Sequence, residues 1–430
     1  MSTENVGTGP PVLVYHPGLP RPSRHRWPLI VLLFTGMVVC YGHRGALSVA
    51  APMMMQKMGL SPAVMGVLLS ALFWTYCFLQ VPAGWLVDRW GPKRTYAAGF
   101  GLWSAASALT GFVTTQPALI AVRMTVGAGQ AAAFPASARI VSEWFAQSER
   151  GLITAIYLMG VRVGQALVGA TGPLLLAAYG SQAFFLVTGV LPLIWLWPWM
   201  QVVGSKERQM AGDALAAASP APPRKPTSFL ASMALLKQPT VLGIFLGFFA
   251  YDYTWFVFVN WLPGYLVLER HFSTKEMAFY SSVPYIAMSV IILLSGISSD
   301  WLIRRGHEEA LVRKIFICAG LAVACAIVPA GLVADKNVAV WLLTISLCGL
   351  GISAPNTWAL TQAVCSKNLV GTASGIQNFG GNVGGILAPA LTGYIAHVTG
   401  SFAMALSLTG FILVGGILSY LLLISKRVEG

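Results

Sequence analysis

The chain has 430 residues, of which 56% are hydrophobic and only 10% are charged. Ordinary soluble domains carry about 25% charged residues, so a water-soluble protein of this length could not cover its surface with so few, and lipid must surround most of it. The net charge of +13 does not indicate nucleic-acid binding, because the Lys and Arg residues lie in short loops between apolar runs, where they orient a protein in a membrane.

Apolar runs long enough to cross a bilayer recur twelve times along the chain. A hydrocarbon core of about 30 Å requires about 20 apolar residues of helix. The predicted helices span residues 28–51, 62–87, 95–115, 117–138, 151–174, 181–203, 239–262, 276–298, 311–333, 338–364, 370–396 and 401–424. The sequence therefore predicts an all-α membrane protein with twelve transmembrane helices.

The longest polar break contains SPAPPRKP and an alanine-rich stretch, and it predicts a flexible linker between two six-helix halves. If both termini are cytoplasmic, twenty of the 27 Lys and Arg residues lie in inside segments and only four in outside loops. The positive-inside rule favours that orientation. The expected parts are a cytoplasmic tail (1–27), an N-terminal bundle (28–203), a cytoplasmic linker (204–238), a C-terminal bundle (239–425) and a short cytoplasmic tail (426–430).

An internal repeat relates the two halves. GWLVDRWGPKR (84–94) closes the second predicted helix and GISSDWLIRRG (296–306) closes the eighth, each with Gly, then Asp four residues later, then a basic pair. The first resembles the signature loop of the major facilitator superfamily, and the second fits that family's duplicated fold. The resemblance implies two pseudo-symmetric bundles that give alternating access from the two sides of the membrane.

A narrower resemblance concerns two further segments. RMTVGAGQAAAFPASARIVSEWF followed by ERG (123–151) and NFGGNVGGILAP (378–389) are similar to motifs of the anion:cation symporter branch. Members of that branch import organic acids such as sugar acids and aromatic or dicarboxylic acids. The resemblance implies a monomeric importer of a small organic anion in the cell membrane, which would be the inner membrane of a Gram-negative bacterium.

Five ionisable side chains lie well inside the predicted helices: His43, Arg44, Arg123, Arg162 and Asp252. A charge within the membrane costs about 2.5–3.5 kcal/mol on insertion scales, so each one requires a reason. Three are arginines and one is a carboxylate, and a cavity with that balance selects an anion. Guanidinium groups suit carboxylate recognition because they can bind it in bidentate fashion.

The predicted substrate contacts combine these arginines with polar and aromatic residues of the same helices. They are Arg44, Arg123, Arg162, Tyr41, Tyr76, Gln130, Gln165, Trp358, Asn378 and Asn382. The alternative is that the arginines snorkel or pair with Asp252, and that the amides only hold helices together. Arg162 is not expected from the branch, and it points to a second anionic group on the substrate.

The ion-coupling residues depart from the branch pattern. The branch usually has an acid just before the helix-one arginine and another seven residues after the helix-four arginine, where this chain has His43 and Gln130. Gln130 cannot carry a proton, so His43 and Asp252 are the candidates for proton symport. Exchange or facilitated diffusion without a proton stays open as the alternative.

The resemblance also implies that Asp88, Arg89 and Arg94 brace a closed inner gate through ion pairs, with Asp300 and Arg304 as a weaker counterpart. The alternative is a charge cluster that only orients the protein. No nucleophile with its base, phosphate loop or metal-ligand spacing occurs, and the six cysteines are scattered. We expect neither an enzyme nor a cofactor or metal site. The rival functions are an exporter of drugs or neutral solutes in the same fold, and a membrane sensor.

Overall fold

The computed structural model describes residues 26–145, 147–203, 234–366 and 369–424, and helices make up nearly all of this part of the chain. The first half contains α1 (Arg26–Met58), α2 (Pro62–Trp90), α3 (Pro92–Leu109), α4 (Gln116–Gln130), α5 (Ala133–Trp144), α6 (Gln147–Val190), η1 (Leu191–Trp195) and α7 (Leu196–Val202). The second half contains η2 (Ala234–Lys237), α10 (Pro239–Leu268), α11 (Thr274–Arg304), α12 (Glu309–Ala324), α13 (Ile327–Leu332), α14 (Lys336–Val364), α15 (Val370–Thr399) and α16 (Ala403–Leu423).

These elements cross the membrane at the twelve predicted places. In the described residues, eight helical segments are long and apolar enough to span a bilayer, and one of them, Glu149–Val202, includes two crossings. They are separated by Gly180, whose φ of 75° and ψ of 173° interrupt the helix. The remaining three crossings contain more glycine or polar residues than these eight segments. They are α3, α4 together with α5, and α15. Most of the predicted linker and both tails lie outside the described residues, so the domain limits stay a prediction.

Two predicted helices are broken, which corrects the expected spans 117–138 and 311–333. The first ends at Gln130 and resumes at Ala133, and the second ends at Ala324 and resumes at Ile327. A proline explains each break, because Pro135 and Pro329 have no N–H to donate to the carbonyl four residues earlier. The helical ladder is therefore lost there, and Val328 N donates instead to Cys325 O at 3.0 Å.

Side-chain caps fix where several helices begin at the outer end. Ser61 accepts a hydrogen bond from Val64 N at the start of α2. Ser273 and Glu276 form a capping box at the start of α11. Asp335 accepts from the backbone of the first residues of α14. These caps satisfy N–H groups that a helix start leaves without partners.

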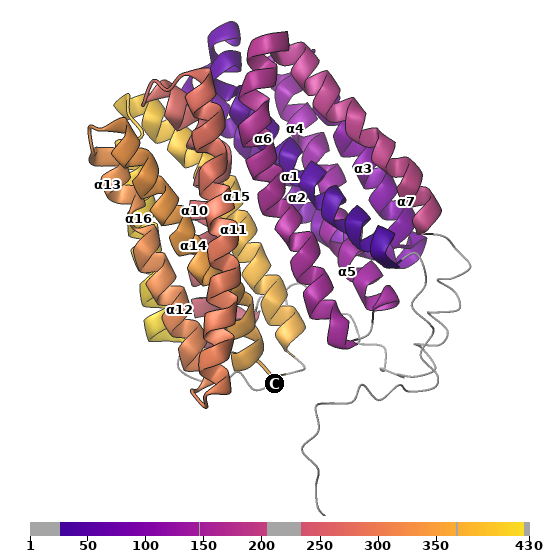
Figure 1. Ribbon diagram of the computed structural model, residues 1–430, viewed down its shortest axis with the longest axis vertical. Coiled ribbons are helices and arrows are strands. Elements are labelled where there is room, and N and C mark those ends of the chain that lie inside the picture. Colours follow the sequence, from indigo (N-terminus) through magenta and orange to yellow (C-terminus); the bar gives the residue numbers. More distant parts are fainter. Residues whose placement is uncertain (1–25, 146, 204–233, 367–368, 425–430) are drawn as a thin grey trace, which may run out of the picture.

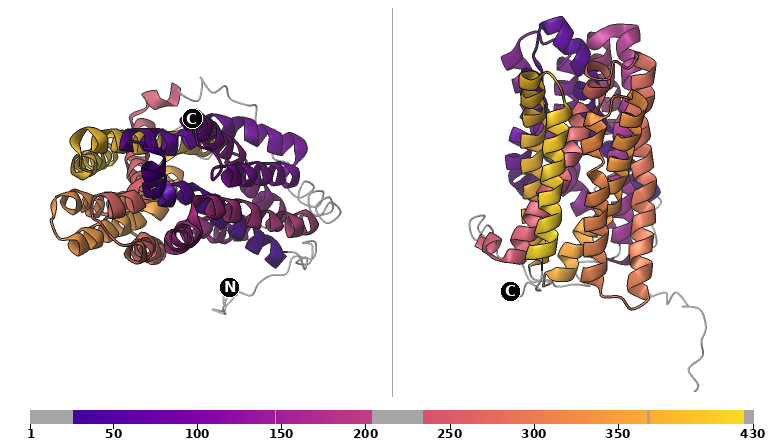
Figure 2. Two further views of the ribbon diagram at one scale, coloured as in Figure 1. Left: turned by 90° about the horizontal axis from the view of Figure 1, so that it is seen from above. Right: turned by 90° about the vertical axis from the view of Figure 1, so that its left-hand side faces the viewer.

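The two halves lie side by side, with their helices running along one axis (Figures 1 and 2). At the outer end they are in close contact: Ser48 Oγ donates to Asn260 O at 2.6 Å, and Gly66 packs against the backbone of Pro389 and Gly393. At the cytoplasmic end, which contains the start of α1 and the end of α16, the halves diverge (Figure 1).

Glycines of α2 and α15 show that these two helices pack differently at their two ends. A Cβ on Gly84 of α2 or on Gly375 of α15 would have no neighbour within 4 Å, whereas a Cβ on Gly66 would lie 2.6 Å from Pro389 O. The packing between α2 and α15 is therefore tight at the outer end and loose toward the cytoplasm.

Candidate functional site

Arg44 lies in α1 with 2% of its surface exposed, and its guanidinium is fixed by neighbours from three helices. Its Nε donates to Gln130 Oε1 at 2.7 Å, and its Nη1 donates to the Tyr41 hydroxyl at 3.3 Å. The rings of Tyr41 and Tyr76 flank it, with centroids 4.4 and 4.3 Å from Cζ. These contacts hold one edge of the guanidinium and leave the other edge able to bind an anion.

The free edge of Arg44 has no partner in the described part of the chain. Its Nη2 is buried without a hydrogen bond, and no carboxylate of a described residue lies within ion-pair distance. A buried guanidinium without a counter-ion is costly in a membrane. An anion that binds there would supply the missing charge and the missing acceptor.

Two glutamines hold the α1 segment around Arg44 in place. Gln130 Nε2 donates to Cys40 O at 3.0 Å, and Gln165 Nε2 donates to Tyr41 O at 3.2 Å. Five predicted substrate contacts, Tyr41, Arg44, Tyr76, Gln130 and Gln165, therefore lie together. Because the amides of Gln130 and Gln165 are both engaged with α1, their first effect is to orient that helix.

Arg123 and His43 lie in the interior of the N-terminal half. Arg123 is 3% exposed, its Nε is buried without a partner, and it forms no ion pair with any described carboxylate. His43 Nε2 lies 2.6 Å from Thr188 O, so that nitrogen carries the proton, because a carbonyl only accepts. In the neutral ring His43 Nδ1 is then an acceptor, and it is buried without a partner.

Arg162 lies on α6 against the C-terminal half. Its guanidinium is stacked over the ring of Trp255, with Cζ 4.3 Å from the centroid, and its Nε is buried without a hydrogen bond. Tyr251, one turn before Trp255 on α10, has a buried hydroxyl that also lacks a partner. Asp252, the one carboxylate predicted in the membrane, forms no ion pair with a described arginine and packs against Gly381.

The remaining predicted contacts lie on the C-terminal half. Asn378 Nδ2 donates to Gln80 Oε1 at 2.9 Å, and Asn382 Nδ2 approaches the same oxygen at 3.4 Å. Gln80 belongs to α2, so these amides connect the two halves. Trp358 is 39% exposed and packs its ring against Phe248, with centroids 5.2 Å apart.

The predicted gating residues form ion pairs inside each half and not between the halves, as far as the described residues extend. Asp88 lies 3.6 Å from Arg139, and Asp300 lies 2.7 Å from Arg313. Arg89 is stacked near Trp85. Arg94 and Arg304 are exposed and form no ion pair with a described residue.

Sequence reasoning missed three residues that the structure adds to these clusters. Phe73 lies three residues before Tyr76, and its ring is 5.6 Å from the Arg44 guanidinium and 4.5 Å from the ring of Phe256 in the other half. The spacing from Tyr76 is the signal that could have found it. Arg139 of α5 contacts Asp88 of α2, and Arg313 of α12 contacts Asp300 of the preceding helix, α11, 13 residues earlier. No local pattern indicates either pairing.

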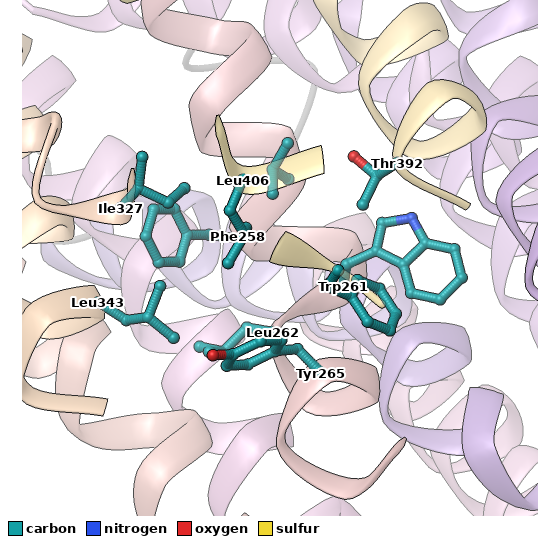
Figure 3. Close-up of a pocket in the computed structure, with 10 residues that line it drawn as sticks. Phe258, Trp261, Leu262, Tyr265, Ile327, Leu343, Thr392 and Leu406 are labelled. Atoms are coloured by element: carbon teal, nitrogen blue, oxygen red, sulfur yellow. The ribbon is translucent and has the colours of Figure 1, made fainter. Parts of the chain in front are cut away.

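Two apolar cavities lie away from these charges. One, between α10 and its neighbours in the C-terminal half, is lined mainly by apolar side chains such as Phe258, Leu262 and Leu406, and Thr392, Trp261 and Tyr265 add polar atoms (Figure 3). The other, about 570 Å³, lies at the outer end and is lined by residues such as Met53, Met55 and Met277. Neither has a charged lining residue, so neither suits an anion.

The sequence of the whole chain identifies the family. The profile of the Major Facilitator Superfamily matches residues 33–389. The chain belongs to this superfamily. Its members are transporters, so this multi-pass membrane protein is a transporter and not an enzyme, and the predicted twelve-helix fold is confirmed.

Individual relatives of this facilitator protein are known over nearly its full length. The D-galactonate transporter of Escherichia coli O6:H1 is 32% identical over 95% of this chain and 98% of the relative. The hexuronate transporter of Bacillus subtilis is 30% identical over 90% and 92%. The fold is similar to that of an inward-facing, unoccupied bacterial homolog of the human lysosomal transporter Spinster, with a TM-score of 0.77 at 16% identity over 95% and 99% of the two chains.

Proposed function

We propose that this protein imports a small organic anion of the sugar-acid class, as a monomer, by alternating access with proton symport. The names of the relatives, a D-galactonate transporter and a hexuronate transporter, support the class of cargo. Both of those cargoes carry a carboxylate, and a carboxylate is the group that a fixed guanidinium binds best.

The observation that carries the proposal is the state of Arg44. Its guanidinium is oriented by Gln130 and Tyr41, flanked by two aromatic rings, and buried with Nη2 unpaired. A carboxylate at Nη2 would replace the hydration that the arginine lost on burial. The surrounding hydroxyls and amides would then bind the hydroxyl groups of a sugar acid.

Alternating access is supported by the unequal packing of the two ends. The outer ends are joined by the Ser48–Asn260 hydrogen bond and by close glycine contacts, while the cytoplasmic ends are apart. Rocking the halves about the centre would open the outer end and close the inner one. Asp88 and Asp300, with Arg89, Arg94 and Arg304 nearby, lie where the inner ends would then meet.

Asp252 is the stronger of the two candidates for the coupled proton. Its carboxyl lies in the membrane on α10 without an ion pair in the described residues, so it can exist with or without a proton. His43 is held by Thr188 inside the N-terminal half, away from the other half. We infer that protonation of Asp252 accompanies inward movement of the anion.

Uptake into proteoliposomes tests both parts. We expect labelled sugar acid to enter, and an inward proton gradient to accelerate entry into vesicles with the native protein but not with Asp252→Asn. His43→Gln serves as the comparison and should keep the response to the gradient. Entry that ignores the gradient in the native protein would overturn symport and favour exchange, while no entry of any organic acid would overturn the cargo class.

A further inference from the structure

Arg162 of α6 also has a buried Nε without a hydrogen bond, and its neighbours differ from those of Arg44. Arg44 contacts α2 and α4 of the N-terminal half through Tyr76 and Gln130. Arg162 instead contacts Trp255 of the C-terminal half, whose ring is itself packed edge-on against Tyr285. Both arginines belong to the N-terminal half, on α1 and α6, but only Arg162 contacts a residue of the C-terminal half.

The charges of both arginines reach the same space. Gln165, about one turn after Arg162 on α6, donates to Tyr41 O at 3.2 Å, and the Tyr41 hydroxyl accepts from Arg44 Nη1 at 3.3 Å. Phe73, beside Arg44, is packed against Phe256, the neighbour of Trp255 in sequence. A single small molecule beside these aromatic rings would be within the field of both guanidinium groups.

The charge balance fixes how much negative charge that space lacks. Inside the membrane-spanning part of the described residues, Arg44, Arg123 and Arg162 contribute three positive charges, and Asp252 contributes one negative charge. Two of these positive charges remain without compensation when Asp252 is ionised, and all three remain when Asp252 carries the coupled proton. In either state a monoanion would leave at least one arginine buried and unpaired, which is unfavourable in a low-dielectric site.

The polar groups around Arg162 form a binding edge. Its Nε and the Tyr251 hydroxyl are both buried without partners, and Tyr251 and Trp255 are one turn apart on α10, so they share a face. A guanidinium N–H together with a phenol O–H can donate to the two oxygens of one carboxylate. Trp255 holds the guanidinium flat by cation–π contact.

We propose that the cargo is a dianion, with one acidic group at Arg44 and a second at Arg162 and Tyr251. This inference rests on the proposed function, because it assigns the second end of the same cargo. It makes Arg162 the residue that selects diacids over monoacids. Substrate would also join the halves, since its two ends bind residues of α1 and of α6 with α10.

The test compares acids that differ by one carboxylate. The purified full-length protein is titrated with D-galactonate and galactarate, and with butyrate and succinate, and the dissociation constant is taken from thermal stabilisation. We expect each diacid to bind at least about tenfold more tightly than its monoacid, as one charge-assisted pair of hydrogen bonds implies. Arg162→Gln should weaken the diacids by a similar factor and leave the monoacids within about threefold.

Further variants separate this inference from a folding defect. Arg270→Gln removes an arginine that bonds the carbonyls of Ala330 and Val333 at the outer end, and it should leave the diacid-to-monoacid ratio unchanged. If Arg162→Gln does not fold, Arg162→Lys and Tyr251→Phe should each reduce the ratio by about threefold to tenfold.

The outcomes distinguish the two proposals. Equal binding of monoacid and diacid by the native protein, or equal weakening of both by the Arg162 variants, overturns the dianion while organic-anion transport stands. If the preference for diacids survives Arg162→Gln but disappears in Asp252→Asn, the second carboxylate binds elsewhere. That result also overturns the assignment of this carboxylate to Arg162 and Tyr251. Binding of neither member of either pair overturns the proposed function and this inference together.

Discussion

Gly66 controls how closely the outer ends of the two halves can approach, and its substitution gives the sharpest test of the conformation. A Cβ on Gly66 would lie 2.6 Å from Pro389 O and 3.2 Å from the Cα of Gly393. Both are backbone atoms, and the carbonyl of Pro389 is also held by Trp261 Nε1 at 2.9 Å. They cannot rotate away as a side chain would, so Gly66→Ala must push α2 and α15 apart.

The expected size follows from the cost of overpacking, which is about 1–3 kcal/mol for a methyl group forced into a filled contact. The cost falls only on the state whose outer ends are closed, because the contact is absent once the halves separate there. The population of that state should therefore fall by about fivefold to 150-fold relative to the outward-open state. Uptake, which needs both states, should slow.

The assay uses Ser48→Cys as a reporter in a protein whose six native cysteines are replaced. Ser48 is fully buried at the contact with Asn260, so a membrane-impermeant maleimide added outside reaches it only when the outer ends part. We expect Gly66→Ala to accelerate labelling by the same factor as the population shift. Gly84→Ala, on the same helix with no neighbour within 4 Å, is the matched control and should not accelerate it. Identical labelling rates in both variants would refute the packing that defines this state.

Three further variants test other contacts. Arg44→Lys keeps the charge but loses the Nε hydrogen bond to Gln130 and the planar stacking on Tyr76. We expect the dissociation constant for a carboxylate, measured by calorimetry, to rise about tenfold or more. An unchanged dissociation constant would contradict the proposed site. Arg313→Gln removes hydrogen bonds to Ser299, Asn356 and Asp300, which should destabilise the fold by about 1–3 kcal/mol and lower the melting temperature without altering cargo selectivity.

The third variant in this group, Glu276→Gln, probes the start of α11 outside the membrane. Hydrogen bonds from Ser273 and the nearby Lys336 lower the pKa of Glu276 to about 2. A lowered pKa means that the charged form stabilises the fold above the ordinary value of about 4.5, and that this contribution is lost as pH falls toward 2. Melting curves should show the variant less stable than the native protein at pH 7, and the difference in melting temperature should become smaller below pH 4.5. A difference that does not depend on pH would rule out stabilisation by the charged form of Glu276.

The sequence alone showed that lipid surrounds most of the protein and where the chain crosses the membrane. Length of apolar run and loop charge depend on residues close together in the chain, so twelve crossings, the duplicated halves and the cytoplasmic termini could be predicted. Hydropathy did not predict the breaks in two of the helices. These breaks occur beside Pro135 and Pro329, where one backbone hydrogen bond is lost, and a hydropathy pattern does not register such a loss.

The sequence also identified the charges that need a reason, since an arginine in an apolar run is conspicuous wherever it points. Only the tertiary structure decided which neighbours each charge has. Arg44 meets Gln130 across 86 residues, Arg162 meets Trp255 of the other half, and Asp300 pairs with Arg313 instead of Arg304. Such contacts depend on how separate helices rotate and pack against one another, and a one-dimensional pattern does not contain that rotation.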